Sequence, residues 1–177
     1  MIALLSLLAC GPSAADIAKA ISSENPVMRE DGSKIAQNYA DELVEAALIT
    51  VIADPSEATR LNAIESLAEI EATTATEALV DRLNNDESPR VRRAAADALG
   101  RLQAQAAAPA LILYVQSFSP SDRQMLAGVW ALGNIGSEAG LEPEVRTAVL
   151  ATLVNLRDSS NDRLIRWQAT SALRTLK

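Results

Sequence analysis

The chain has 177 residues, of which 49% are apolar but only 3% aromatic, so its core must be built from Ala, Leu, Ile and Val, which favours closely packed helices over a sheet. It contains no His and a single Cys, which argues against imidazole-based acid–base chemistry, metal sites that need His, and a disulfide framework. Its net charge of −7 argues against nucleic acid as a partner, because phosphate binding requires a basic stripe.

Residues 1–10, MIALLSLLAC, form an apolar run that ends in the single Cys. The run is much shorter than the roughly 20 residues that span a bilayer, but it suits the hydrophobic region of a signal peptide. Residues 7–10 resemble the lipobox of bacterial lipoproteins, which implies a leader over 1–9, lipidation of Cys10, and a domain over 10–177 anchored on the periplasmic side of a bacterial cell envelope. No Lys or Arg precedes the run, as a signal peptide would require. The alternative is an apolar helix with Cys10 as a buried thiol, in a cytoplasmic protein.

One segment pattern recurs along the rest of the chain. Its best copy is DESPRVRRAAADALGRL at residues 86–102. Further copies follow or precede it at steps of 32, 33 and 41 residues, and the weakest places Pro26 under Pro89. The other copies occupy residues 25–37, 54–70, 121–135 and 162–176. Fixed-period similarity of this kind predicts a repeat architecture.

Each copy begins with a helix-start signature and continues with apolar residues three and four apart. In the best copy Asp86 or Ser88 can cap the helix, Pro89 suits its first turn, and Val91 and Leu99 fall on one apolar face. A second amphipathic segment lies between successive copies. These segments are residues 39–53, 75–84, 106–117 and 143–157, and a further one precedes the first copy. The repeating unit is therefore predicted to be helix, turn, helix.

The sequence PRVRRAAADALGRL followed by APALILYV resembles the HEAT repeat, in the variety found in phycobilisome lyase subunits. The resemblance covers nearly all of residues 13–177. It implies an all-α protein, an α-α superhelix (a HEAT-like solenoid) of about five helical hairpins, whose second helices line a concave face.

In that family, an Asp and an Arg six residues apart form a ladder between neighbouring repeats. Asp54 and Arg60, and Asp86 and Arg92, have this spacing. The resemblance therefore implies a structural role for them, which we favour over catalysis because most ion pairs near a surface only organise local geometry. The later copies keep the pattern less well: Met125 replaces the Arg in one, and a Ser160/Arg166 pair stands in the other.

The concave face is the expected binding surface of a solenoid. An alignment of the second helices predicts that an acidic patch, followed by an apolar one, lies on the concave face. The alternative is that these residues form ordinary solvated surface. The candidate partner-binding residues are Glu45, Glu77, Asp81, Arg82, Leu113 and Tyr114. Thr50, Thr147 and Thr152 are placed on the same face.

The C-terminal end offers a second candidate surface. Residues 151–177 contain five basic and two acidic side chains, and Trp167 lies among them. We expect Trp130 and Trp167 to fill the core or the contacts between repeats, as a Trp at helical spacing usually does. The alternative is that this end contacts a partner.

These features predict a protein that is not an enzyme, but a scaffold module that binds a protein or peptide and touches a membrane only through its lipid anchor. No cofactor, metal site or catalytic residue is predicted. The alternative is a subunit resembling the bilin lyases, or another enzyme accessory subunit. Few aromatic residues are available to enclose a tetrapyrrole, and this alternative rests on the family resemblance alone.

Overall fold

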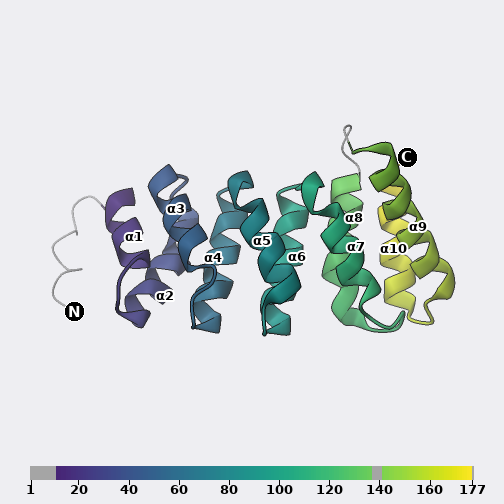
Figure 1. Cartoon of the computed structure of the whole chain (residues 1–177), viewed down its shortest axis with the longest axis horizontal. Coiled ribbons are helices and arrows are strands. Elements are labelled where there is room, and N and C mark those ends of the chain that lie inside the picture. Colours follow the sequence, from purple (N-terminus) through teal and green to yellow (C-terminus); the bar gives the residue numbers. More distant parts are fainter. Residues whose placement is uncertain (1–10, 137–140, 177) are drawn as a thin grey trace. The chain divides into compact units, whose positions relative to one another are not determined.

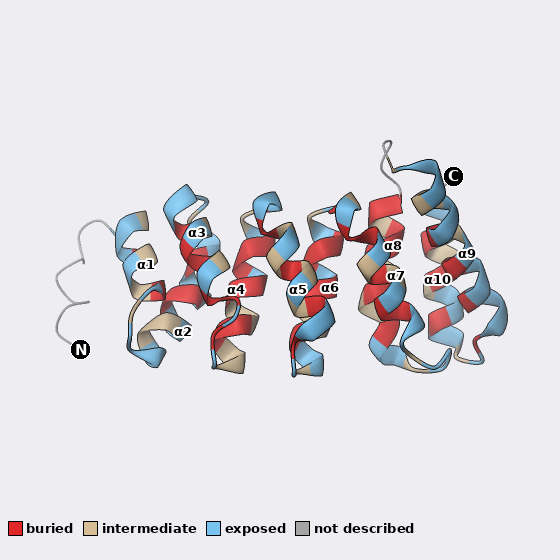
Figure 2. Cartoon of the chain, in the orientation of Figure 1, coloured by how far each residue is buried: buried red, intermediate tan, exposed pale blue. Residues whose placement is uncertain are grey.

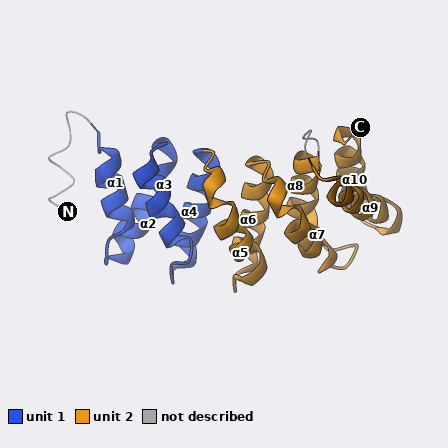
Figure 3. Cartoon of the chain, turned by 45° about the horizontal axis from the view of Figure 1, so that its top comes forward, with its two compact units in different colours: residues 1–70 blue, residues 71–177 orange. Residues whose placement is uncertain are grey.

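The structure is a computed structural model that describes residues 11–136 and 141–176. These residues form helices and connecting turns, with no strand among them (Figure 1). The chain divides into two compact units, residues 1–70 and 71–177 (Figure 3). All of the net negative charge belongs to the first unit, which has eleven acidic and four basic residues, whereas the second has twelve of each.

Unit 1 consists of two layers of helices. Its elements are α1 (Ala14–Ile21), α2 (Pro26–Ile35), the 3-10 turn η2 (Ala36–Asn38), α3 (Glu42–Val51) and α4 (Glu57–Glu69). Helix α1 packs against α2 and α3, and α4 packs against α2 and α3. The layers are therefore α1 with α3, and α2 with α4.

Unit 2 repeats the same arrangement. Its elements are η3 (Thr73–Ala75), α5 (Thr76–Asn85), α6 (Pro89–Arg101), η4 (Gln105–Ala107), α7 (Ala108–Gln116), η5 (Arg123–Met125), α8 (Leu126–Gly136), α9 (Pro143–Ser159) and α10 (Arg163–Thr175). Helices α5, α7 and α9 pack in one layer and α6, α8 and α10 in the other. The hairpins α5–α6, α7–α8 and α9–α10 join the layers. The predicted all-α fold of repeated helical hairpins is confirmed.

The core is made of aliphatic side chains between the layers, with buried positions on the facing sides of the helices (Figure 2). The largest fully buried residues of unit 2 are Leu79, Leu83, Leu99, Leu111, Met125, Leu132 and Ile135. Short helices of this kind are marginal alone in water, so they are stable only when such a face is covered by a neighbour.

Small residues let successive helices of one layer approach closely. A Cβ atom on Gly100 would lie 2.7 Å from the Cα of Ala131, and one on Gly133 would lie 2.7 Å from the Cβ of Ala172. The next helix also donates a hydrogen bond across each approach: Asn134 Nδ2 to the Gly100 carbonyl at 3.4 Å, and Thr175 Oγ1 to the Gly133 carbonyl at 3.2 Å. We call this line of contacts along α6, α8 and α10 the stacking seam.

The Arg of the repeated motif binds the turn before its own helix. Arg60 Nη1 donates to the carbonyls of Asp54 and Pro55 at 2.9 and 3.2 Å, and Arg92 Nη1 donates to that of Asp86 at 2.6 Å. Arg166 does the same to Ser160 at 2.9 Å. The turn residue in turn accepts from the backbone N–H two positions on, as Asp54 Oδ1 does from Ser56 at 2.8 Å. These bonds organise the turn before each helix, as a structural role requires, but they lie within one repeat, whereas the resemblance implied a ladder between repeats.

The first copy contains the same turn, but it lacks the Asp of the motif and was therefore not predicted from the sequence. Arg29 Nη1 donates to the carbonyls of Ser23 and Glu24, both at 3.0 Å, and the N–H of Asn25 donates to Ser23 Oγ at 3.2 Å. A Ser therefore replaces the Asp here, as Ser160 does in the last copy, where it accepts from the N–H of Asp162 at 3.1 Å.

Ion pairs connect neighbouring hairpins within each unit. Arg29 Nε lies 2.5 Å from Asp54 Oδ2 in unit 1, and Arg123 Nε lies 2.9 Å from Asp162 Oδ2 in unit 2. Burial of Asp54 by itself raises the pKa of this carboxyl, but the hydrogen bonds from Arg29 and Ser56, with the charges of Arg29 and Arg60, lower the pKa below its usual value. The charged form of Asp54 therefore stabilises the folded state.

The seam predicts a steric effect of Gly100→Ala. The added Cβ would overlap backbone atoms of Ala131, so α6 and α8 must separate, and overpacking of this kind costs about 1–3 kcal/mol. We expect a lower melting temperature in thermal unfolding followed by circular dichroism. Gly11→Ala is the matched control, because nothing lies within 4 Å of a Cβ at that position. Equal melting temperatures for the two variants would show that the seam is not tightly packed.

The ion pair predicts a pH-dependent effect of Asp54→Asn. Because the pKa of Asp54 is lowered on folding, the carboxylate contributes stability above the unfolded value near pH ~4 and loses it as the pH falls through the folded value. We expect the variant to be less stable by about 2 kcal/mol at neutral pH, with the difference shrinking below pH ~4. Urea unfolding at several pH values measures this. Asp97→Asn, on an exposed side chain of α6, is the control, and a difference independent of pH would contradict the assignment.

Candidate functional site

The outward positions of α5, α7 and α9 form one surface of unit 2. The three helices show the same order of exposed and buried residues at offsets of 32 and 38 positions, so equivalent side chains point the same way. We call the exposed set the outer face; it consists of Glu77, Asp81, Asn84, Pro109, Leu113, Gln116, Thr147, Ala151 and Val154. The chemistry of the face changes from helix to helix.

The α7 and α9 part of the outer face carries no charge. Helix α7 has no charged residue, and neither has α9 between positions 147 and 156. Leu113 is 65% exposed and Val154 is 37% exposed. An uncharged surface with exposed aliphatic side chains is suited to bind an apolar ligand or protein surface.

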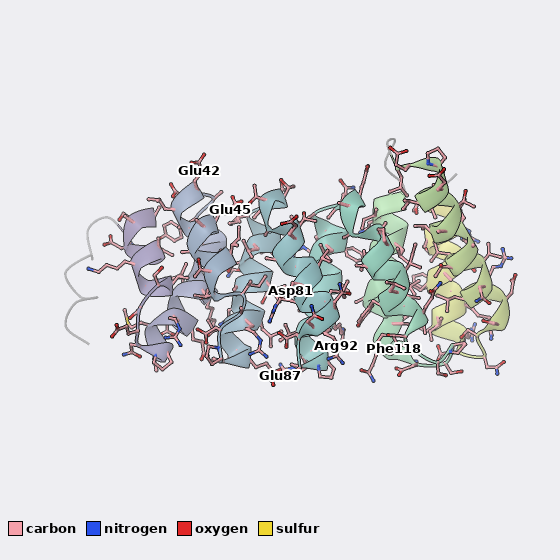
Figure 4. The ribbon with its side chains drawn as sticks, in the orientation of Figure 1. Glu42, Glu45, Asp81, Glu87, Arg92 and Phe118 are labelled. Atoms are coloured by element: carbon pink, nitrogen blue, oxygen red, sulfur yellow. The ribbon has the colours of Figure 1, made fainter. Side chains whose placement is uncertain are left out.

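The α5 part is acidic, and its charges are held in place by neighbours. Asp81 accepts hydrogen bonds from Arg82 Nη2 and, at 2.7 Å, from Asn85 Nδ2, and both bonds lower the pKa of Asp81. Arg82 Nη1 also reaches Asp86 Oδ2 at 3.5 Å. Figure 4 shows Asp81 on the exposed side of α5. Glu77 is exposed at the beginning of the same helix.

Three of the predicted site residues, Glu77, Asp81 and Leu113, are exposed on this face. Glu45 is half-buried on α3 in unit 1, next to the exposed Glu42 labelled in Figure 4. It belongs to the other unit, whereas these three belong to unit 2. Whether any of them binds a partner stays a prediction.

The placement of Tyr114 on an exposed binding surface is wrong. Tyr114 is only 7% exposed, its ring meets Phe118 edge to face at 5.0 Å, and its hydroxyl donates to the Gln124 carbonyl at 3.2 Å. Burial raises the pKa of its hydroxyl, and the charges of Arg92 and its neighbour Arg93 partly oppose that effect. Tyr114 closes the α7–α8 turn, the one turn in which Met125 replaces the Arg.

Arg82 and Thr152 are turned inward for the same reason as Tyr114. The three occupy equivalent positions on α5, α7 and α9, one residue beyond the outward position. Thr152 is 7% exposed and bonds its own helix, with Oγ1 2.9 Å from the Ala148 carbonyl. Arg82 is partly covered and engaged with Asp81 and Asp86. Thr147 and, in unit 1, Thr50 are exposed as predicted.

Unit 1 has an open hollow between α1 and α3. It is lined by Ala15, Ala18, Lys19, Ser22, Leu43, Ala46, Ala47 and Thr50. Lys19 is the single charged group among them, and the Thr50 hydroxyl is engaged with the Ala46 carbonyl at 3.0 Å. The sequence analysis did not find this hollow, because its floor consists of alanines that look like ordinary helix interior.

The other predicted features divide between residues inside and outside the described part of the chain. The leader and Cys10 lie outside the described residues. Among those described, no cluster of His, Cys, Asp and Glu could hold a metal ion, and no helix is both long and apolar enough to cross a bilayer. Trp130 lies against Gly100 at the stacking seam, as predicted, whereas Trp167 is 62% exposed and does not fill a core.

Comparisons with known proteins bear on fold and function. Two matches to HEAT repeats cover residues 44–132 and 76–174. One solved structure, the complex of CpcE and CpcF of phycocyanin lyase from Nostoc sp. PCC7120, is similar over 95% of this chain and 67% of the other, with a TM-score of 0.74 and 23% identity. An engineered protein is similar over 92% of this chain and 96% of its own, with a TM-score of 0.59 and 16% identity. No curated protein sequence matches.

These findings correct one expectation and confirm another. The prediction that the protein is not an enzyme is contradicted by the similarity to a solved chain of a phycocyanin lyase complex. The predicted family is confirmed, because the matched residues cover most of the chain and contain the stacked hairpins described above. The chain belongs to the HEAT repeat family.

Proposed function

We propose that this chain is a HEAT-repeat subunit of a bilin lyase-type enzyme and acts together with a protein partner. The observation that carries the proposal is the shared fold with a subunit of the phycocyanin lyase complex over 95% of the chain. That structure is itself a complex of two different chains, which supports a protein partner for this one. The proposal does not extend to a lipid anchor.

The outer face is the part of unit 2 best suited to the substrate of such an enzyme. Its α7 and α9 portion offers Leu113, Ala151 and Val154 to an apolar surface, and the acidic Glu77 and Asp81 border it on α5. Ligand sites generally combine a mostly apolar surface with a few fixed polar groups. Asp81 is such a fixed group, because Arg82 and Asn85 hold its carboxylate.

Binding of a free bilin tests the proposal. We expect the purified chain to shift the absorbance of the bilin and to keep the shifted pigment through gel filtration. We expect the pair Leu113→Glu and Val154→Glu to weaken binding about tenfold, the equivalent of roughly 1.4 kcal/mol, because both substitutions place charge on the apolar part of the face.

The control for these variants is Val27→Glu, which changes a side chain 63% exposed on α2 in unit 1. Bilin that elutes unbound from the unmodified chain would contradict the lyase-type assignment. Bilin binding that is equally strong in the face variant and the control would instead place the substrate elsewhere on the chain.

A further inference from the structure

Helix α10 carries an exposed stripe that combines an aromatic ring with positive charge. Its members are Arg163, Trp167, Thr170 and Arg174, spaced four, three and four residues apart, so they lie on one side of the helix. The helix contains three Arg and no acidic residue. The side chains of Arg163 and Arg174 make no hydrogen bond or ion pair within the described residues.

The stripe positions of α10 can be compared with the equivalent positions of α6 and α8. The positions on α6 and α8 that correspond to Thr170 are Ala96 and Val129, both fully buried. Those that correspond to Arg174 are Gly100 and Gly133, where even a Cβ would collide with the next helix. On α10 Thr170 is partly exposed and Arg174 is exposed. Arg174 therefore fills the space that Gly100 and Gly133 leave open for a closely packed helix.

Polar side chains at these positions would be sufficient for solubility, but that requirement does not explain Trp167. Its indole is 62% exposed, the largest apolar side chain so exposed in the described part of unit 2, and Leu164, 40% exposed, lies one turn before it. Exposed Trp and Arg residues together are typical of the centres of protein interfaces. The guanidinium groups require carboxylates on the bound surface, with which they can form bidentate hydrogen bonds.

We propose that the Arg163–Trp167–Arg174 stripe docks an acidic segment of a partner protein, with an apolar side chain of that segment covering Trp167. This inference rests on the proposed function, since it identifies the surface that the partner of the subunit contacts. Charge favours a protein over nucleic acid or an anionic membrane. Two Arg are few for phosphate tracking, and the net charge of −7 on the whole chain repels a polyanion more than a short acidic segment.

Trp167 is itself the reporter for the test. In a Trp130→Phe background it is the only Trp of the chain, and selective excitation reports on its surroundings alone. The probe is a synthetic amphipathic peptide of about 15 residues, long enough to form a helix, with Glu and Leu on opposite faces. We expect a saturable blue shift of the Trp167 emission that weakens with added salt, because salt screens exposed charges.

Variants identify the residues that bind. The pair Arg163→Glu and Arg174→Glu should weaken binding of the Glu peptide at least about tenfold. The pair Arg90→Glu and Arg93→Glu makes the same change of charge on exposed positions of α6 and should leave the affinity within about twofold. Trp167→Ala, followed by anisotropy of a labelled peptide, should also lose affinity. Circular dichroism confirms that each variant is folded.

Three results would overturn the proposal. These are an unchanged Trp167 emission with the Glu peptide, an equal response to the same peptide with Lys at every Glu, and equal affinity in the α10 and α6 variants. An equal or stronger response to a single-stranded oligonucleotide or to phosphatidylserine vesicles would assign the stripe to that class instead. The titration contains no bilin, so failure of the lyase-type function and failure of this docking surface are separate outcomes.

Discussion

The close approach of helices within one layer is the constraint on which the rest of the structure depends. A helix of about 13 residues cannot hide its apolar side alone, and this chain has few large aromatic residues to bridge wide gaps. Gly100 and Gly133 bring the next helix near enough for alanine side chains to fill the space. The core is filled by close approach of the helices and not by large side chains. A single added methyl group at the seam would therefore clash with the next helix.

The arginines of the repeated motif fix the turns that precede their helices. Arg60 and Arg92 donate hydrogen bonds to the carbonyls of the turns that precede their helices. In the third copy Met125 takes the place of the Arg, and the Tyr114 hydroxyl donates to the Gln124 carbonyl in η5. This bond is not equivalent to those of the arginines, because the residue that corresponds to Asp54 and Asp86 is Ser119. The hydrogen bond and the edge-to-face contact with Phe118 keep Tyr114 away from the surface.

Repeat order was readable from the sequence, but the rotation of each helix was not. The 32-residue step, the caps and the turn spacing follow from residues close together in the chain, and they predicted the hairpins correctly. A helical pattern of 3.6 residues per turn leaves the outward direction uncertain by one position, which is why Leu113 was placed correctly and Tyr114 was not. Contacts between repeats, such as Arg29 with Asp54, join residues far apart in sequence. No local pattern indicates them.

The two surfaces of unit 2 suit different chemistry, and the difference follows from their positions in the repeat. The outer face lies along α5, α7 and α9, at positions that pack against no other described helix of unit 2. The side chains there do not affect the stacking seam, and those of α7 and α9 are uncharged. The exposed side of α10 corresponds to the positions on α6 and α8 where Gly100 and Gly133 let the next helix approach closely. On α10 Arg174 fills that space, and Trp167 on the same side of the helix offers a contact to an acidic surface of a different shape. Blocking one partner and selecting another are thus achieved by the same few side chains.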